Sequence, residues 1–130
     1  HLQRCNTLFQ PPLNTYVVLE DYSNKLYEKS ITYEAWDNEL LIGLAAVYNN
    51  TIANEVFLTN LSVEKEYHGF GIAKNLMKLL VETAKKEGFD LVKLEVKQNN
   101  LKVFDFHSSN GFVKIGANND CYIMIYEIKP

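Results

Sequence analysis

The chain has 130 residues, 47% of them hydrophobic and 12% aromatic, which suffices for one domain with one core and excludes two. Its formal net charge is -3, and Lys and Arg are scattered among Asp and Glu, so no face for binding nucleic acid is predicted. No apolar run approaches the roughly 20 residues that a membrane span needs, and no signal peptide is expected before the domain.

Two cysteines, Cys5 and Cys121, lie far apart in the sequence and lack the spacing of metal ligands. Neither a disulfide framework nor a metal site is therefore predicted. The simpler interpretation is a protein of the reducing cytoplasm.

The first half of the chain predicts a helix and a hairpin. Residues 1–15, which include two consecutive prolines, are expected to be irregular. A helical stretch follows at 20–30. Residues 32–36 and 40–48 are predicted strands around an Asp-Asn turn, and residues 49–51 form the next turn.

The second half alternates strands and helices. An apolar strand at 56–63 leads through a glycine turn into a helix at 72–86, which Gly88 ends. A strand at 91–96, a helix beginning after Asn100 and a final strand at 121–128 complete an α+β chain around a mixed sheet.

The feature that indicates chemistry is the glycine turn, residues 68–73, with the sequence His-Gly-Phe-Gly-Ile-Ala. The first turn of a helix has unpaired backbone N–H groups and the positive end of the helix dipole, so it attracts anions. Gly69 and Gly71 lack a Cβ and let a phosphate approach the backbone. The turn is predicted to bind a pyrophosphate, with a plain turn as the alternative.

Three phosphate-binding designs compete for this turn. A P-loop ends in Gly-Lys-Ser/Thr, whereas Lys74 here follows Ala73 and precedes Asn75. A Rossmann fingerprint needs Gly or Ala where Lys74 stands, and more chain than the roughly 60 residues that remain. The third design is the turn Arg/Gln-x-x-Gly-x-Gly/Ala of the GCN5-related N-acetyltransferases (GNAT). The chain resembles it at Gly71 and Ala73, with His68 where Arg or Gln is usual.

A second motif of the same family follows downstream in the expected order. It is a strand, then Asn-x-x-Ala, an apolar segment and Tyr-x-x-x-Gly-Phe. Asn100, Gly111 and Phe112 match it, while Val103 stands at the Ala position and His107 at the Tyr position. With both motifs present, most of the chain resembles the GNAT family.

The resemblance implies a single domain over residues 1–130, with a mixed, mostly antiparallel central sheet flanked by helices. It also implies an enzyme that moves the acetyl group of acetyl-CoA to a primary amine by direct attack in a ternary complex. A small-molecule amine is the first expected acceptor, because a neutral-to-acidic surface attracts cations, while peptide N-termini and lysines stay open. A homodimer is a possible assembly. The alternatives are a non-catalytic domain that binds or senses acyl-CoA, and a plain scaffold.

The family places the cofactor where two strands splay apart. There the backbone N–H groups of Leu61, Ser62 and Val63 would pair with pantetheine and the thioester oxygen, unless this is an ordinary ladder strand. The pyrophosphate would be held by the turn residues His68, Gly69, Phe70, Gly71, Ile72 and Ala73, although His68 could instead face solvent. Asn100 is predicted to be a helix N-cap and is matched to a pantetheine contact.

Candidate catalytic residues are His107, Thr59 and Asn60. His107 stands where the family's tyrosine is expected to protonate the leaving thiolate, so three interpretations stay open: His107 is the acid, water is, or activity is lost. Many relatives place a Glu that acts as general base at the position of Thr59, which Asn60 follows. A water held by Thr59 or Asn60, or an amine substrate of low pKa, could remove the need for it. Glu55 is interpreted as an exposed charge at the start of a strand.

Overall fold

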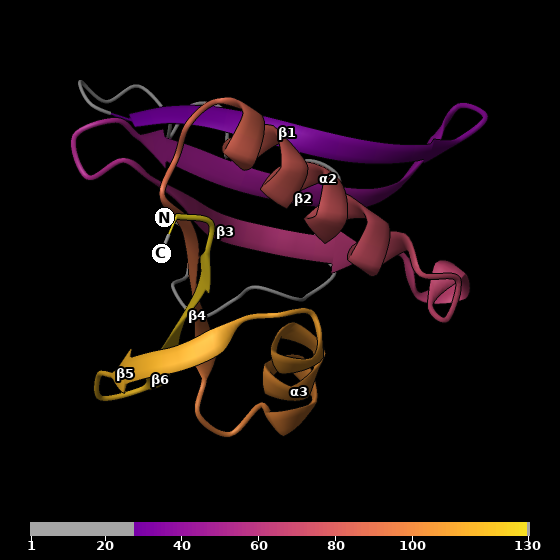
Figure 1. The fold of residues 1–130 in the computed structure, drawn as a ribbon. Coiled ribbons are helices and arrows are strands. Elements are labelled where there is room, and N and C mark those ends of the chain that lie inside the picture. Colours follow the sequence, from indigo (N-terminus) through magenta and orange to yellow (C-terminus); the bar gives the residue numbers. More distant parts are fainter. Residues whose placement is uncertain (1–27, 130) are drawn as a thin grey trace.

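The structure, a computed structural model, describes residues 28–129. These residues form a six-stranded sheet in the order β1-β2-β3-β4-β6-β5, with helices packed on it (Figure 1). The elements in chain order are β1 (Glu28–Asp37), β2 (Leu40–Asn50), β3 (Glu55–Val63), the 3-10 helix η1 (Lys65–Tyr67), α2 (Ile72–Lys86), β4 (Leu91–Lys97), α3 (Leu101–Ser109), β5 (Val113–Ala117) and β6 (Cys121–Glu127).

The sheet is mixed and mostly antiparallel, as predicted. Only β3 and β4 run parallel, while the other neighbouring strands pair antiparallel. The predicted hairpin is confirmed, and Asn38 in its turn has a φ of 58°, a left-handed conformation that Asn tolerates. The predicted helix after the glycine turn is confirmed as α2, with Gly88 beyond its end at a φ of 85°.

Three boundaries differ from the prediction. Residues 28–30 begin β1, so the end of the predicted 20–30 helix is wrong; its earlier part and the irregular segment 1–15 lie outside the described residues. The turn expected at 49–51 comes later, because Asn49 and Asn50 pair with Val56 and Glu55. β5 was not predicted, since it is short, contains a glycine and is mostly exposed.

Both helices lie on one face of the sheet. An ideal Cβ built on Gly43 of β2 would stand 2.9 Å from Ile72 Cγ2, so α2 packs very closely on this strand. Phe104 of α3 meets Tyr122 of β6 edge to face, with ring centroids 5.4 Å apart. The core between helices and sheet is built by buried side chains that include Val47, Leu58, Leu61, Leu76, Leu80, Leu94, Val96, Phe112 and Met124.

The feature of the sheet that positions the site is the separation of β3 from β4. Within the described part of the chain, the two strands pair only over three residues each, from Glu55↔Leu91 to Phe57↔Lys93. Beyond these pairs β3 continues to Val63 and β4 to Lys97 without a ladder between them. The splayed strands predicted from the family resemblance are therefore present.

A β-bulge interrupts β3 just beyond this point. Leu58 pairs with Val47 and Asn60 with Ala46, so Thr59 is an extra residue without a partner in β2. The Thr59 hydroxyl donates a hydrogen bond to the Ala46 carbonyl, with 3.0 Å between the oxygens. A bulge shifts the alternation of side chains along a strand, and this one decides which face Asn60 occupies.

Cys121 at the start of β6 is buried and disulfide-bonded. This corrects the expectation of a chain with reduced cysteines. That expectation rested on separation along the sequence, which does not determine separation in the fold.

Candidate functional site

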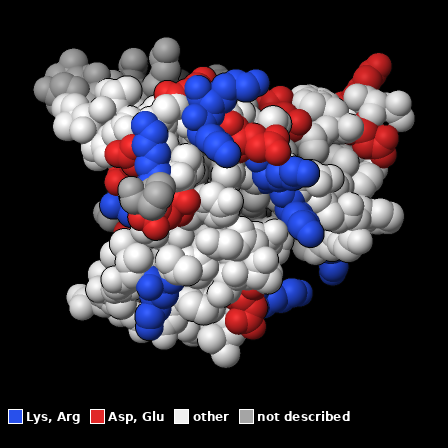
Figure 2. All heavy atoms as spheres, viewed as in Figure 1, with Lys and Arg blue, Asp and Glu red and all other residues white. Residues whose placement is uncertain are grey.

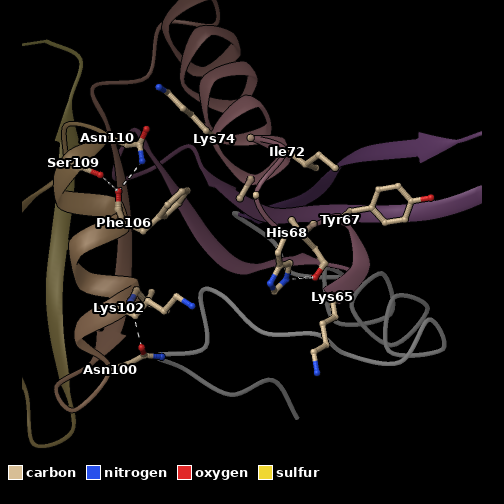
Figure 3. Close-up of a pocket in the computed structure, with 15 residues that line it drawn as sticks. Lys65, Tyr67, His68, Ile72, Lys74, Asn100, Lys102, Phe106, Ser109 and Asn110 are labelled. Atoms are coloured by element: carbon tan, nitrogen blue, oxygen red, sulfur yellow. Dashed lines mark hydrogen bonds between the residues drawn. The ribbon is translucent and has the colours of Figure 1, made fainter.

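A cavity of about 930 Å³ opens between the end of β3, the glycine turn, the start of α2 and the side of α3 (Figure 3). Its volume is in the range of cavities that bind small molecules and cofactors. The lining residues are Val63, Lys65, Tyr67, His68, Gly69, Gly71, Ile72, Ala73, Lys74, Asn100, Lys102, Val103, Phe106, Ser109 and Asn110. The two motifs singled out in the sequence thus meet at one cavity.

The start of α2 offers the cavity unpaired backbone donors. Its N-cap is Gly71, which has a φ of 76° and no side chain to cap the helix. The first intrahelical bond runs from the Asn75 N–H to the Gly71 carbonyl at 3.0 Å, so the three N–H groups before Asn75 have no acceptor within the helix. The first turn also contains no acidic residue, and the positive end of the helix dipole is left for an anion.

The two glycines of the turn leave room for a ligand. Gly69 and Gly71 both have positive φ, 89° and 76°, which residues with a Cβ adopt only with strain. An ideal Cβ at either position would meet no atom within 4 Å, so backbone conformation and not packing requires glycine here. An open turn with free donors suits a pyrophosphate.

Three lysines make the cavity cationic. Figure 3 shows Lys65 in η1, Lys74 at the start of α2 and Lys102 on α3, each from a different element around the cavity. Elsewhere on the visible face, basic and acidic side chains lie intermixed (Figure 2). The three lysines were not predicted as a group, because they come together only in the fold. Their positions next to the two family motifs were the available signal in the sequence.

The backbone at the end of β3 faces two directions. The Glu64 N–H donates to the Ile42 carbonyl at 2.8 Å, and backbone groups alternate along a strand, so those of Ser62 also face β2. The backbone groups of Leu61 and Val63 face the side where β4 has diverged. Of the three residues expected to contact pantetheine through the backbone, two therefore have the required orientation.

His68 lies in the cavity wall and is hydrogen-bonded to β3. Its Nε2 lies 2.9 Å from the Val63 carbonyl oxygen, which can only accept, so Nε2 is the donor. This bond fixes the ring against the end of β3. A neutral His68 therefore directs its one donor to Val63 rather than to a phosphate.

Asn100 is confirmed as the N-cap of α3. Its Oδ1 accepts a hydrogen bond from the Val103 N–H at 3.2 Å, and the residue also lines the cavity. The side chain thus satisfies the helix start and presents its other atoms toward the same space as the glycine turn.

His107 is placed in the core and is not among the residues that line the cavity. It is fully buried between Phe106 and Phe112, with ring centroids 5.1 and 5.5 Å away. Burial lowers the pKa of His107 from 6.5 to about 4. Neither ring nitrogen has a hydrogen-bond partner in residues 28–129.

Thr59 and Asn60 also lie outside the cavity lining. Thr59 uses its hydroxyl within the bulge. Asn60 is 1% exposed, and both polar atoms of its side chain lack partners in the described structure. Phe70 is 72% exposed and is not among the residues that line the cavity.

No group of three or more His, Cys, Asp or Glu residues that could hold a metal ion is found among residues 28–129. Within the same residues, no helix is long and apolar enough to cross a membrane.

Comparison with known proteins identifies the class. Residues 2–112 match the acetyltransferase (GNAT) family, and the chain belongs to this family. Its members are transferases that use acetyl-CoA as the cosubstrate. No curated protein matches the sequence.

Several solved structures share the fold. The PaiA N-acetyltransferase of Thermoplasma acidophilum, crystallised with coenzyme A, has a TM-score of 0.71 at 25% identity, over 88% of this chain and 69% of its own. The ribosomal-protein-S18-alanine N-acetyltransferase of Escherichia coli has a TM-score of 0.71 at 19% identity, over 94% and 80%. A spermidine N-acetyltransferase chimera from Vibrio cholerae and hSSAT has a TM-score of 0.68 at 19% identity, over 88% and 75%.

Proposed function

We propose that this GNAT chain transfers the acetyl group of acetyl-CoA to the primary amine of a small molecule, through direct attack in a ternary complex. The observation that carries the proposal is the uncapped start of α2, which opens with Gly69 and Gly71 onto a cationic cavity of about 930 Å³. Acetyl-CoA supplies a thioester carbonyl that an amine can attack, and the chain supplies the binding and orientation.

Different residues of the cavity are proposed to bind different parts of acetyl-CoA. The free N–H groups at the start of α2 would hold the pyrophosphate, and Lys65, Lys74 and Lys102 would neutralise phosphate charge. Asn100 matches the family residue that contacts pantetheine. Because its Oδ1 caps α3, the contact would come from its amide nitrogen Nδ2. The outward-facing N–H of Leu61 is a donor for the thioester oxygen, where negative charge develops during attack.

The leaving thiolate needs a proton, and the environment of His107 favours water as its source. A histidine with a pKa of about 4 is almost entirely neutral near pH 7 and has no imidazolium proton to donate, and His107 is buried away from the cavity. A general acid must reach the atom that it protonates. Among the three interpretations left open by the sequence, protonation by water fits these facts best.

The acceptor is proposed to be a small cationic amine. The net charge of -3 favours cations over anions. The spermidine N-acetyltransferase chimera named above acts on such an amine by its name, whereas the Escherichia coli protein is named for a protein N-terminus. Both classes therefore belong in the first substrate panel.

The test combines binding with turnover. Thermal unfolding would be followed with coenzyme A, acetyl-CoA, ATP and NAD, since a ligand at 100 times its Kd adds about 2.7 kcal/mol to the free energy of unfolding. Release of free thiol from acetyl-CoA would then be measured with polyamines, amino sugars and an alanine-initiated peptide. Stabilisation by the two coenzyme A species together with amine-dependent thiol release is the expected result; no stabilisation by either would contradict the proposal.

A non-catalytic acyl-CoA binding domain is the second candidate. The buried His107, at a position where the family uses a tyrosine, is the observation in its favour. This candidate predicts stabilisation by acetyl-CoA without thiol release on any amine, so the same experiment separates the two.

We also propose a cytoplasmic location, where acetyl-CoA would be supplied. The disulfide bond of Cys121 argues against a reducing compartment. Trapping thiols with an alkylating reagent while cells are lysed in denaturant would decide: an alkylated Cys121 supports the cytoplasm, and a Cys121 that is alkylated only after reduction contradicts it. The homodimer stays a prediction, and analytical ultracentrifugation can test it by measuring the mass of the protein in solution.

A further inference from the structure

The wall of the cavity that faces the glycine turn carries a cation of its own. We propose that Lys102 of α3 binds the 3′-phosphate of coenzyme A. The chain then accepts acyl groups from coenzyme A thioesters and discriminates against donors without this phosphate, such as dephospho-coenzyme A or a carrier protein that bears phosphopantetheine. This inference rests on the proposed function, because it assigns a second phosphate of the same cosubstrate.

The cavity is positively charged, although the formal net charge of the chain is -3. Three lysines line it, and no Asp or Glu is among its lining residues. Within residues 28–129, no salt bridge pairs any of these lysines with a carboxylate. Like charges around one cavity repel each other, and an anionic ligand between them replaces that repulsion by attraction.

Coenzyme A has one phosphate more than the start of α2 accounts for. The proposed site at the start of α2 binds the pyrophosphate. The ribose carries a separate phosphate monoester, with a charge of about -1.5 to -2 near pH 7. Such a group adds to affinity only where cations or N–H donors replace its water. The 3′-phosphate therefore needs a second cationic position in the cavity.

The three lysines lie on two different walls of the cavity. Lys65 belongs to η1 and Lys74 to the first turn of α2, so they stand before and after the glycine turn, on the wall that this turn forms. Lys102 belongs to α3, and Figure 3 shows its side chain extending from that helix into the space in front of the glycine turn. Lys102 is thus the cavity lysine that faces the pyrophosphate site from the opposite wall.

Lys102 also occupies a position where its own helix disfavours a cation. α3 begins at Leu101, so Lys102 is its second residue, and the first turn contains no acidic residue. The helix dipole is positive at this end, so a positive side chain there is unfavourable until an anion binds. The charge of Lys102 and the dipole of α3 attract an anion to the same part of the cavity.

The one acidic residue of α3, Asp105, does not neutralise this charge. It lies three residues after Lys102, a spacing at which two side chains on a helix can meet. No salt bridge joins the two in the described residues, and Asp105 is exposed and does not line the cavity. The ammonium group of Lys102 is therefore available to a ligand.

A contact at the 3′-phosphate has a defined effect on catalysis. This phosphate is remote from the thioester, and its interaction with Lys102 is the same before and during acetyl transfer. Such uniform binding lowers the KM for the acyl donor and leaves kcat unchanged. Lys102 is thus proposed to select the donor and to take no part in the chemical step.

The test is a thermodynamic cycle between one phosphate and one lysine. Calorimetric titration of the full chain would measure the Kd of coenzyme A and of dephospho-coenzyme A, for the unaltered chain and for Lys102→Gln. The unaltered chain should bind coenzyme A about tenfold more tightly than dephospho-coenzyme A, and Lys102→Gln should reduce that ratio to about twofold. An unchanged ratio in Lys102→Gln would overturn the assignment.

Two variants serve as controls, and the exposure of both lysines favours normal folding of each. Lys74→Gln, on the wall of the glycine turn, should weaken both ligands by the same factor and keep the ratio. Lys102→Arg preserves the charge and should also keep the ratio. A ratio that falls in Lys74→Gln and not in Lys102→Gln would place the 3′-phosphate on the other wall and contradict the assignment.

Turnover gives an independent readout, and binding separates the two proposals. With an amine that the chain acetylates, Lys102→Gln should raise the KM for acetyl-CoA about fivefold at unchanged kcat; a lower kcat at unchanged KM would contradict a role in binding alone. If the unaltered chain binds coenzyme A and dephospho-coenzyme A equally well, this inference fails and the proposed function stands. If it binds neither, the proposed function fails as well.

Discussion

The two α-helices within residues 28–129, α2 and α3, start at the same cavity but begin in different ways. α2 starts at a glycine with no side chain to cap it, whereas α3 starts at Asn100, whose Oδ1 accepts the Val103 N–H. The donors at the start of α2 are therefore left for a ligand, while α3 satisfies one of its own. The uncapped N–H groups of a helix are satisfied by water or by a ligand, so we propose the start of α2 as the anion site and α3 as the supporting wall.

The difference extends into the body of each helix. α2 continues as 15 residues on the sheet, with Leu76, Met77, Leu80 and Ala84 buried. α3 is shorter, 9 residues, and buries Val103 and the unpartnered His107. We infer that the length of α2 provides a rigid base for binding, and that α3 carries the more destabilising polar burial.

The largest expected effect comes from closing the open start of α2. Gly71→Asp puts a side chain at a φ of 76° and a carboxylate where the pyrophosphate is proposed, so coenzyme A affinity should fall at least about 100-fold. Calorimetric titration measures it.

Gly88→Asp is the matched control for that substitution. Gly88 has a φ of 85° and an equally open surrounding, but it lies beyond the other end of α2. It should lose stability and keep its affinity. Equal losses of affinity in the two variants would show that strain, and not the anion site, explains the result.

The next effect concerns the core of α3 and depends on pH. The pKa of folded His107 is about 4, below the 6.5 of an unfolded histidine, so only the unfolded chain takes up a proton between these values. The free energy of unfolding should therefore fall by about 3 kcal/mol as the pH drops from 6.5 to 4. His107→Phe should reduce this dependence in urea unfolding at several pH values, and an unchanged dependence would contradict a buried neutral histidine.

A smaller effect is expected from the cavity lysines. Lys74→Gln and Lys102→Gln should each weaken coenzyme A binding about fivefold, because partly solvated charges contribute modestly. Added salt should reduce the difference from the unaltered chain. Lys78→Gln, exposed on α2 but outside the cavity, serves as the control and should bind normally.

The smallest effect tests the cap that distinguishes α3 from α2. Asn100→Ala removes the bond to the Val103 N–H and should lower the free energy of unfolding by about 1 kcal/mol. Thermal unfolding measures the change. Asn100→Asp keeps a capping oxygen and should be as stable as the unaltered chain. If Asn100→Asp is instead as unstable as Asn100→Ala, loss of the cap does not explain the lower free energy of unfolding.

Much of the secondary structure could be predicted from local sequence signals. The apolar period of α2, the glycine after it and the asparagine before α3 depend on neighbouring residues only, and the structure confirms them. The glycine turn was recognisable because its backbone conformation restricts the residue type.

The remainder depends on contacts between distant segments. The bulge at Thr59 exists relative to β2, and it decides the face of Asn60. The burial of His107 follows from packing between Phe106 and Phe112, and the lysine group arises from three separate elements. The spacing of residues in the sequence does not show which distant segments are in contact, so these three features could be seen only in the structure.

The most direct test of the central claim is a crystal structure of the chain with coenzyme A. The account predicts that the pyrophosphate oxygens lie within hydrogen-bond distance of the backbone N–H groups at the start of α2, beside Gly69 and Gly71. A pyrophosphate bound elsewhere, with these N–H groups facing only solvent, would contradict it.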